Sequence, residues 1–436
     1  MKKLLALLLV VLMLVPMFGA AAEEKITITF WSFTDELSKI VDDYYKPAHP
    51  EVEIVYVLTP TADFPGKLDP MLATNAAEAP DVFALEADFA KKYIESEHTA
   101  SLLDLGFTEE DLKAAVPAVV DFGRDPSGTP KALSWQATPG ALFYRASLAE
   151  KYLGVKTPEE FQELVKDVDA FYDTALKLDE ASNGEVKMFS SLGDIVKPFL
   201  YLREKGWVAD NKLVIEDVLL ELMDLAKDMK TDGLYNEATQ WQESWFLGMK
   251  SDITMCYFLP TWGLHYVLKP NSRTDTTVDP ALGNGTYGDW RMVNGPVGYS
   301  WGGTWLGANA AKVAEASDAK KAAIKELINF ITMDPAFLTQ YAKDSGDFVS
   351  NIEVAKAIAA EATPNDFLGG QDHYGAFAAS SLIINASNKT AYDLDIERLF
   401  NDNCLIPYVN GEKDKDTAIA DFKAAVAALF NNITVE

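Results

Sequence analysis

Residues 26–57 read ITITFWSFTDELSKIVDDYYKPAHPEVEIVYV. Apolar and polar residues alternate in the first five positions, which predicts a β-strand. Apolar positions then recur every three or four residues from Leu37 to Tyr45, which predicts a helix, and two prolines end it. The apolar run at 52–57 predicts a second strand. A strand, a helix and a strand joined by short links form a βαβ unit, so we expect a parallel sheet with a right-handed crossover.

The same alternation continues downstream, with a helix expected around residues 66–77 and a strand at 81–85. The first part of the chain is therefore expected to be a doubly wound α/β lobe. Thr108 and Thr157 are each followed three residues later by an acidic residue, which is typical of a capping box at a helix start. Residues 269–298 are rich in Gly, Pro, Asn, Thr and Asp, which predicts a long irregular segment.

The charge of the chain excludes one class of function. The sequence has 38 Lys and Arg against 66 Asp and Glu, so its formal charge is 38 − 66 = −28 at pH 7, and it has no basic run. Nucleic-acid binding depends on clustered Lys and Arg that release counterions from phosphates. We therefore expect no nucleic-acid partner. A content of 48% hydrophobic residues is that of a folded protein and not of a disordered acidic chain.

The first 22 residues have the pattern of a secretory signal peptide. Two lysines precede the apolar run Leu4–Val15, a proline breaks it, and small residues at Ala20 and Ala22 predict cleavage before Glu23. The alternative is an uncleaved anchor helix, against which the proline and the small residues argue. No Cys stands at the cleavage site, so a lipid anchor is not expected. The mature protein is expected to be soluble and exported, in a periplasm or another extracellular space of the cell envelope.

Two cysteines, Cys256 and Cys404, are present. In an oxidising compartment they can form a disulfide if the fold brings them together. The apolar neighbours of each also fit two separate buried thiols. The sequence leaves both alternatives open.

Two short motifs match catalytic or nucleotide-binding patterns by spelling alone. Residues 283–288, GNGTYG, fit a dinucleotide fingerprint but lie in an irregular segment that no helix follows. Residues 298–302, GYSWG, fit a nucleophile elbow but are followed by a predicted strand instead of a helix. The four histidines are far apart and form no HExxH motif. We expect no catalytic residue, no metal and no cofactor.

The tryptophans are more informative than these motifs. A neutral sugar has apolar C–H faces and a rim of hydroxyls, so its site needs flat rings and planar amides or carboxylates. Several tryptophans lie at predicted strand ends or beside glycine, outside the apolar stripes of helices: Trp31, Trp135, Trp262, Trp301 and Trp305. Each alone fits a core position, but together they favour a ligand cleft.

Short segments follow one another in a recognisable order along nearly the whole mature chain. They are ITFW (28–31), HPEVEI (49–54), APDVF (79–83), LLDL (102–105), GALFY (140–144), LGV and TPEEF (153–161), GMK and ITM (248–255), PTW (260–262), GGTWL (302–306) and GGQD (369–372). Their order and spacing resemble the extracellular solute-binding proteins of family 1, the carbohydrate-binding subunits of ABC importers, related to maltose-binding protein. Arg145 departs from the pattern, because the family usually has Asn there. The irregular stretch around 270–295 is also long, so the identity of the sugar does not carry over.

The resemblance implies a type II periplasmic-binding-protein clamp, with two doubly wound α/β lobes joined by crossing hinge strands. The crossings are expected near 131–138 and 299–307. The first lobe then comprises residues 23–133 plus 303–348, and the second comprises residues 134–302 plus 349–436. Such lobes close on the solute, and tighter binding to the closed form shifts the population toward it.

The resemblance also implies a set of ligand-binding residues. Aromatic rings are expected to stack on the sugar, with Trp262 as a main platform. Acids and amides are expected to bind the hydroxyl groups, and glycine allows the backbone to approach the ligand closely. The set is Trp31, Glu86, Asp88, Gln136, Thr138, Asp194, Trp262, Trp301, Gly303, Trp305, Gln371 and Asp372. For Trp305 a core position is an equal alternative.

The function that the resemblance implies is that of a non-catalytic, monomeric receptor. It is expected to capture a mono- or oligosaccharide and to deliver it to ABC-transporter permease subunits in the membrane. One alternative is a secreted glycoside hydrolase, which would use the same aromatic and acidic residues. The other is the same fold binding a cationic solute such as a polyamine, which the strong negative charge would favour, although solubility also accounts for that charge.

Overall fold

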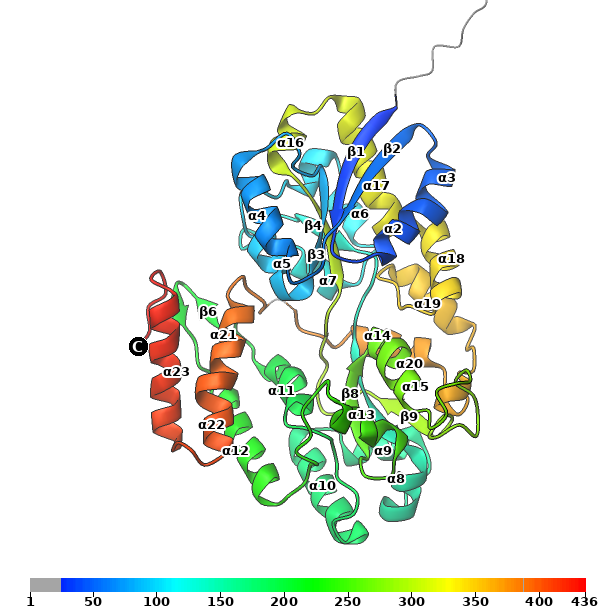
Figure 1. Ribbon diagram of the computed structural model, residues 1–436, viewed down its shortest axis with the longest axis vertical. Helices are drawn as coiled ribbons and strands as arrows, with labels where there is room; N and C mark the ends of the chain where they lie inside the picture. Colours follow the sequence, from blue (N-terminus) through cyan, green and yellow to red (C-terminus); the bar gives the residue numbers. More distant parts are fainter. Residues whose placement is uncertain (1–24, 387) are drawn as a thin grey trace, which may run out of the picture.

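The computed structural model describes residues 25–386 and 388–436, and the predicted signal peptide lies outside them. The chain forms two α/β layers, one above the other in Figure 1, joined by a few crossing segments. The upper layer holds a five-stranded sheet in the order β2-β1-β3-β10-β4. Its strands are β1 (Ile26–Ser32), β2 (Val52–Leu58), β3 (Val82–Glu86), β4 (Ala132–Ser134) and β10 (Thr304–Ala308).

The N-terminal βαβ unit is confirmed. Strand β1 runs parallel to both β2 and β3, with Ile26 opposite Val52 and Phe30 opposite Val82. Strand β10 returns from much later in the chain and pairs antiparallel with β3 and β4. The predicted first helix is a continuous helical run over residues 36–48, with a π-helical turn at Val41–Tyr45.

Helices flank the upper sheet on either side in Figure 1. They are α2 (Glu36–Ile40), α3 (Lys46–Ala48), α4 (Phe64–Thr74), α5 (Ala87–Ile94), α6 (Glu109–Leu112), α7 (Pro117–Phe122), α16 (Ala310–Glu315), α17 (Asp318–Met333), α18 (Pro335–Ser345) and α19 (Ile352–Ala360). Both predicted capping boxes are present. Thr108 caps α6 together with Asp111, and Thr157 caps α9 (Pro158–Leu164) together with Glu160, which satisfies amide groups that a helix start leaves unpaired.

The lower layer contains a three-stranded sheet in the order β8-β5-β9. Its strands are β5 (Gly140–Arg145), β8 (Cys256–Pro260) and β9 (Trp290–Val293), and both neighbours pair antiparallel with β5. The predicted α/β class is confirmed. Strand β9 lies inside the stretch predicted to be irregular. The sequence did not reveal this strand because four residues between loops are too few to show an alternation of apolar and polar residues.

The lower layer is rich in helices and ends in a group of helices on its left in Figure 1. Besides α9 they are α8 (Ala146–Leu153), α10 (Val168–Ser182), α11 (Gly193–Phe199), α12 (Asp217–Thr231), α13 (Glu243–Lys250), α14 (Thr261–Gly263), α15 (Lys269–Asn271), α20 (His373–Ser381), α21 (Asp393–Phe400), α22 (Ile406–Val409) and α23 (Lys415–Leu429). A small hairpin pairs β6 (Val208–Ala209) with β7 (Lys212–Leu213).

The chain passes between the layers at residues 135–139, which link β4 to β5, and at residues 300–303, which lead into β10. Pro139 forms a β-bridge with Ser300, so the two segments run beside each other. A third passage follows α19 and reaches the lower layer by Phe367, whose carbonyl accepts from the amide of Gly288. Three connections of this kind are typical of a hinge.

Two further sequence features are explained by the fold. Arg145, at the end of β5, is buried and donates to Asp289 (2.6 Å) and Asp252 (2.8 Å), so it ties the long irregular segment to the sheet. Cys256 and Cys404 are separate buried thiols, which resolves the open alternative. Between residues 25 and 436, with 387 left aside, no helix is both long and apolar enough to cross a bilayer.

Candidate functional site

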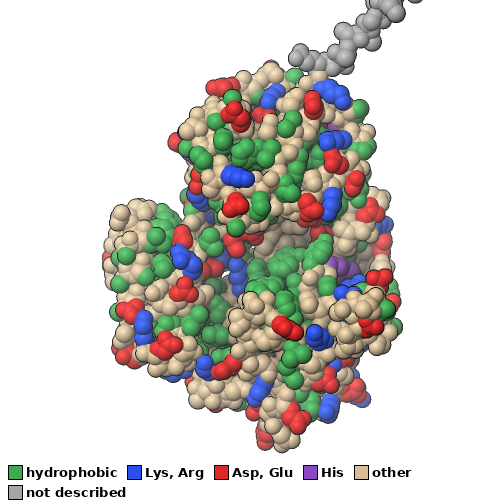
Figure 2. Space-filling view, viewed as in Figure 1, with side chains coloured by type: hydrophobic (Ala, Val, Ile, Leu, Met, Phe, Trp, Pro, Cys, Tyr) green, Lys and Arg blue, Asp and Glu red, His purple; other side chains and the backbone are tan. Residues whose placement is uncertain are grey.

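A cavity of about 330 Å³ lies where the two layers meet. Side chains from the upper layer, such as Phe122 and Trp305, line it together with residues of the lower layer, such as Lys197 and Asp393. Residues of both crossing segments complete the lining. Figure 2 shows the surface hollowed between the layers, with hydrophobic side chains gathered along the lower edge of the hollow. The volume lies within the range of small-molecule sites, about 300–1,000 Å³.

Three of the predicted ligand-binding residues line this cavity: Asp88, Thr138 and Trp305. The Trp305 ring stacks on Phe122 with centroids 4.2 Å apart, and its indole N–H donates to the carbonyl of Val119 (3.1 Å). Only 4% of Trp305 is exposed. Trp305 is therefore both a wall of the cavity and a buried core residue.

The crossing segments are held together by side chains at the cavity. The Thr138 hydroxyl lies 3.0 Å from Ser300 Oγ and donates to the carbonyl of Gly302 (2.9 Å). Gly303 has φ +112°, and a Cβ there would come within 2.9 Å of the Trp305 ring, so glycine is required. The carbonyl of Gly303 accepts from the amide of Ala87, which joins the crossing to the start of α5.

Two carboxyl groups stand at the start of α5. Glu86 is the N-cap, and its side chain accepts from the amide of Asp88 (2.7 Å). Burial and the nearby Asp88 charge raise the pKa of Glu86 to about 7. Asp88 keeps 52% of its side chain exposed and pairs with Lys197 of the lower layer at 3.5 Å. Glu86 and Asp88 thus both lie at the junction of the layers. Asp88 is the more exposed of the two and can exchange Lys197 for another partner.

Three tryptophan rings form a cluster beside the crossing segments, and one of them, Trp301, lies on a crossing. Trp262 and Trp301 were predicted, and the Trp262 N–H donates to the carbonyl of Trp301 (2.8 Å). The third ring, Trp241, is nearly parallel to Trp262 at 6.2 Å and nearly perpendicular to Trp301 at 5.6 Å. The amide of Trp301 donates to the carbonyl of Thr138 (3.1 Å), so the cluster adjoins the cavity lining. Flat rings grouped in this way suit the apolar faces of a ring-shaped solute.

Sequence reasoning missed Trp241. Its ring is 39% exposed, and its backbone has φ +68°, a left-handed conformation that is costly for a residue with a Cβ. The available signal was an aromatic residue inside the polar stretch TQWQES, residues 239–244, where no hydrophobic stripe accounts for it. Such strain persists where the surrounding structure holds the residue in place, and it is concentrated at functional sites.

A sequence profile of bacterial extracellular solute-binding proteins matches residues 39–367. The chain belongs to this family. It is therefore an exported protein that binds a solute. Among curated protein sequences, none matches this solute-binding protein.

Solved structures share the fold over nearly the whole solute-binding protein. A structure described as an extracellular solute-binding protein of family 1 has a TM-score of 0.79 at 18% identity, covering 92% of this chain and 99% of that one. The sugar-binding protein MalE from Xanthomonas citri has 0.72 at 15%, covering 92% and 97%. The galacto-N-biose- and lacto-N-biose I-binding protein of the ABC transporter from Bifidobacterium longum, in complex with lacto-N-biose, has 0.68 at 15%, covering 95% and 99%.

Asp194 has a supporting position in this solute-binding protein. It is fully buried and accepts from the amides of Ser190 and Ser191, from Gln240 (3.2 Å) and from the indole of Trp245 (2.7 Å). Burial raises its pKa to about 6, although these hydrogen bonds act in the opposite direction. Because Gln240 and Trp245 flank Trp241, Asp194 positions the segment that carries the missed ring.

Nine of the twelve predicted residues are not among those that line the cavity: Trp31, Glu86, Gln136, Asp194, Trp262, Trp301, Gly303, Gln371 and Asp372. Gln371 donates to the carbonyl and accepts from the amide of Met292, so it pairs with the edge of β9. Asp372 caps α20 by accepting from the amides of Tyr374 and Gly375. Trp31 is buried at the end of β1. Among the described residues, no group of three or more His, Cys, Asp and Glu could hold a metal ion.

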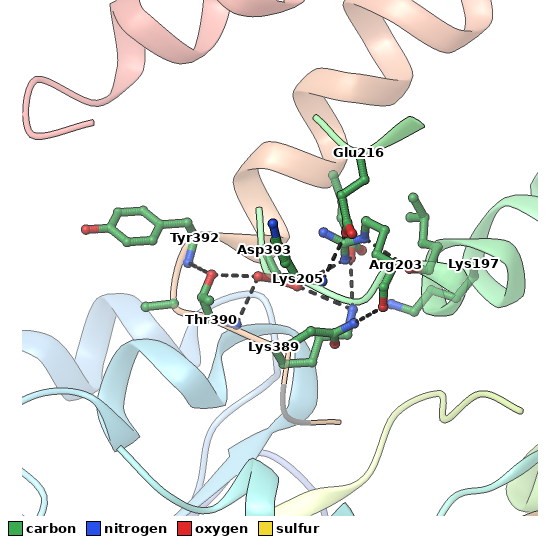
Figure 3. Close-up of polar contacts among 12 residues, drawn as sticks. Lys197, Arg203, Lys205, Glu216, Lys389, Thr390, Tyr392 and Asp393 are labelled. Carbon is green, nitrogen blue, oxygen red and sulfur yellow. Dashed lines mark hydrogen bonds and ion pairs between the residues drawn. The ribbon is translucent and has the colours of Figure 1, made fainter. Parts of the chain in front are cut away.

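A charged wall on the lower side of the cavity was also missed. It consists of Lys197 on α11, Arg203 after it, Lys389 before α21, and Asp393 and Glu397 on α21 (Figure 3). Lys389, Asp393 and Glu397 follow one another at four-residue spacing, which in a sequence is typical of a solvated helix face. Nothing local indicates that the side chains of Lys197 and Arg203 join them.

Proposed function

We propose that this protein is the substrate-binding subunit of an ABC importer and that its solute is a carbohydrate held between the two layers. The Trp241, Trp262 and Trp301 cluster beside the cavity carries this proposal. Pyranose rings present C–H faces that stack on such indoles, while the Thr138 hydroxyl can bind a hydroxyl group. The resemblance in fold to sugar-binding proteins supports the same class of solute.

The proposed mechanism is closure of two lobes about the crossing segments. The proposed lobes are residues 23–133 plus 303–348 and residues 134–302 plus 349–436, with α19 packed against the upper one. Gly302 and Gly303 provide left-handed backbone at one crossing, which absorbs rotation at small cost. A solute that contacts both lobes binds the closed form more tightly than the open form, so it shifts the population toward closure. A membrane permease would then recognise the closed form.

Native mass spectrometry of the mature protein with an equal mixture of common mono- and oligosaccharides tests this proposal. We expect a one-to-one adduct with an intact sugar and no new fragments in solution. Shortened sugars would instead indicate a glycoside hydrolase. Absence of any sugar adduct, with an adduct to putrescine or spermidine added separately, would replace the carbohydrate by a cationic solute.

A further inference from the structure

Three basic side chains converge on the lower wall of the cavity from three separate segments (Figure 3). Lys197 comes from α11, Arg203 from the turn that follows it, and Lys389 from the segment before α21. Arg203 is 1% exposed at its side chain and stacks over Trp207 at 4.4 Å, so its charge is held in place. Lys197 and Lys389 line the cavity, Arg203 lies outside its lining, and acids line the same cavity, among them Asp393 and Glu397.

The carboxylates in the same wall do not pair with all three cations. Asp393 and Glu397 are the two acids within ion-pair distance of Arg203 and Lys389, with separations of 2.9 to 3.6 Å. Among the described residues, Lys197 has no carboxylate of its own layer within ion-pair distance.

The charges of this wall persist at neutral pH. Burial alone would raise the pKa of Glu397, but Lys389, Lys197 and Arg203 hold it at about 2. Burial alone would lower the pKa of Lys197, but the carboxylates of Glu397 and Asp88 raise it above its usual value. Lys197 therefore remains charged beside the cavity.

In this structure Asp88 provides a counter-ion for Lys197 from the opposite layer. Its carboxylate lies 3.5 Å from Lys197 Nζ. Within residues 25–386 and 388–436, this is the one ion pair that connects residues of the upper layer with residues of the lower layer. Asp88 is half exposed and belongs to the layer that would move away when the clamp opens. Opening then leaves the lower wall with an uncompensated charge facing the cavity.

We propose that the solute carries a carboxylate, as in a sugar acid such as a uronic acid. This carboxylate forms an ion pair with Lys197, and Lys389 and Arg203 lie behind Lys197. This inference rests on the proposed carbohydrate-binding function and specifies its solute class. A carboxylate has the same charge and geometry as the Asp88 group that it replaces, whereas a phosphate would bring about two negative charges against the single charge of Lys197. The apolar upper wall, with Val119, Phe122 and Trp305, would contact the ring of the sugar.

A neutral sugar or a cationic solute fits the wall less well. A neutral sugar would leave Lys197, whose side chain is 26% exposed, without an ion-pair partner in any state where Asp88 is displaced. A polyamine would add positive charge beside Lys197 and Lys389. The negative charge of the whole chain does not oppose a bound carboxylate at this position, because charges more than about 10 Å away are largely screened in 0.1 M salt.

Isothermal titration calorimetry of the mature protein tests the inference with matched pairs: D-galacturonic acid against D-galactose, D-glucuronic acid against D-glucose, and α-1,4-digalacturonate against α-1,4-galactobiose. We expect at least one acid to bind tenfold or more tightly than its neutral partner, with an affinity that falls as NaCl rises. Lys197→Met should remove this preference, whereas Lys197→Arg should retain it. Asp88→Asn removes the competing carboxylate and should strengthen binding of the acid severalfold.

Lys356→Met is the matched control, because Lys356 is exposed and pairs with Glu353 far from the cavity lining. It should leave the preference unchanged, and thermal melting of each variant shows that it is folded. Equal or tighter binding of the neutral partners, or a preference for acids that survives in folded Lys197→Met, would overturn the inference while leaving the carbohydrate function intact. If neither these sugars nor the broader neutral panel bind, the carbohydrate function and the inference both fail.

Discussion

The two sides of the cavity junction are built from opposite chemistry. The aromatic cluster of Trp241, Trp262 and Trp301 lies beside the crossing segments and offers flat apolar faces with few polar atoms. The charged wall below presents ammonium, guanidinium and carboxylate groups that are mostly buried. Apolar stacking supplies contact area with little discrimination among sugars, whereas a desolvated charge discriminates strongly between acidic and neutral groups. We therefore expect the aromatic cluster to supply affinity and the charged wall to supply selectivity.

The largest expected effect comes from removing one acid of the charged wall. Glu397→Ala leaves Lys389 and Arg203 with a single carboxylate in a buried environment, so we expect a loss of about 3–5 kcal/mol in the free energy of unfolding. Urea denaturation monitored by tryptophan fluorescence measures it. Asp395→Ala on the same helix removes an exposed pair with Arg398 and should cost about 0.5 kcal/mol or less. Similar losses of stability in both variants would mean that Glu397 is not tightly coupled to Lys389 and Arg203.

The aromatic side is tested by Trp241→Gly. Glycine adopts φ +68° without strain, so the substitution removes the ring while relieving the backbone, and stability should change little. We expect solute affinity to fall about 30-fold, or about 2 kcal/mol, since a buried tryptophan at a contact surface is typically a main source of binding energy. Calorimetry with the solute found by mass spectrometry measures this. Unchanged affinity would exclude Trp241 from the site.

Asp194, which supports the aromatic cluster, should make the free energy of unfolding depend on pH. The folded pKa of Asp194 is about 6 and the ordinary value is 3.8, so the folded state binds a proton between these values that the unfolded state does not. Stability from this group is fully present below pH 3.8 and is lost as pH rises through 6. Acidification from pH 7 to pH 5 should therefore add about 1.3 kcal/mol to the free energy of unfolding.

Asp194→Asn should remove that contribution, so the comparison of interest is the slope of stability against pH in the two proteins. Absolute stability of the variant can fall for a separate reason, because an amide accepts fewer hydrogen bonds than a carboxylate. Glu86, with a pKa raised to about 7, adds a slope of the same sign, which should persist in the variant. An identical slope in both proteins would contradict the assignment to Asp194.

The smallest expected effect concerns the link between the two regions. Thr138→Val removes a hydroxyl that joins both crossing segments and leaves the Gly302 carbonyl without this donor, which should cost about 1 kcal/mol of stability. Thr138→Ser keeps the hydroxyl and is the control. Thermal melting compares the two. If valine and serine have equal effects, the methyl group and not the hydrogen bond holds the crossings together.

Much of the architecture follows from short-range patterns that a sequence displays directly. Alternation and helical spacing in residues 26–57 predicted the βαβ unit, and the residues after Thr108 and Thr157 predicted two helix starts. These features depend on neighbours within a few positions along the chain, so the backbone geometry of the element determines them. The order of short segments along the chain indicated the family, which the match over residues 39–367 shows.

The composition of the site depended on tertiary structure. Lys197 and Lys389 are 192 positions apart by number (389 − 197), yet they share one wall, and Asp88 meets Lys197 only across the junction of the layers. Trp241 lies in a polar loop, and its stacking depends on Trp262 and on the buried Asp194 beneath it. Sequence alone determined which elements form, because local geometry and hydrophobic periodicity are short-range. Only the tertiary structure decided which side chains meet at the cavity, because such contacts depend on how distant elements pack.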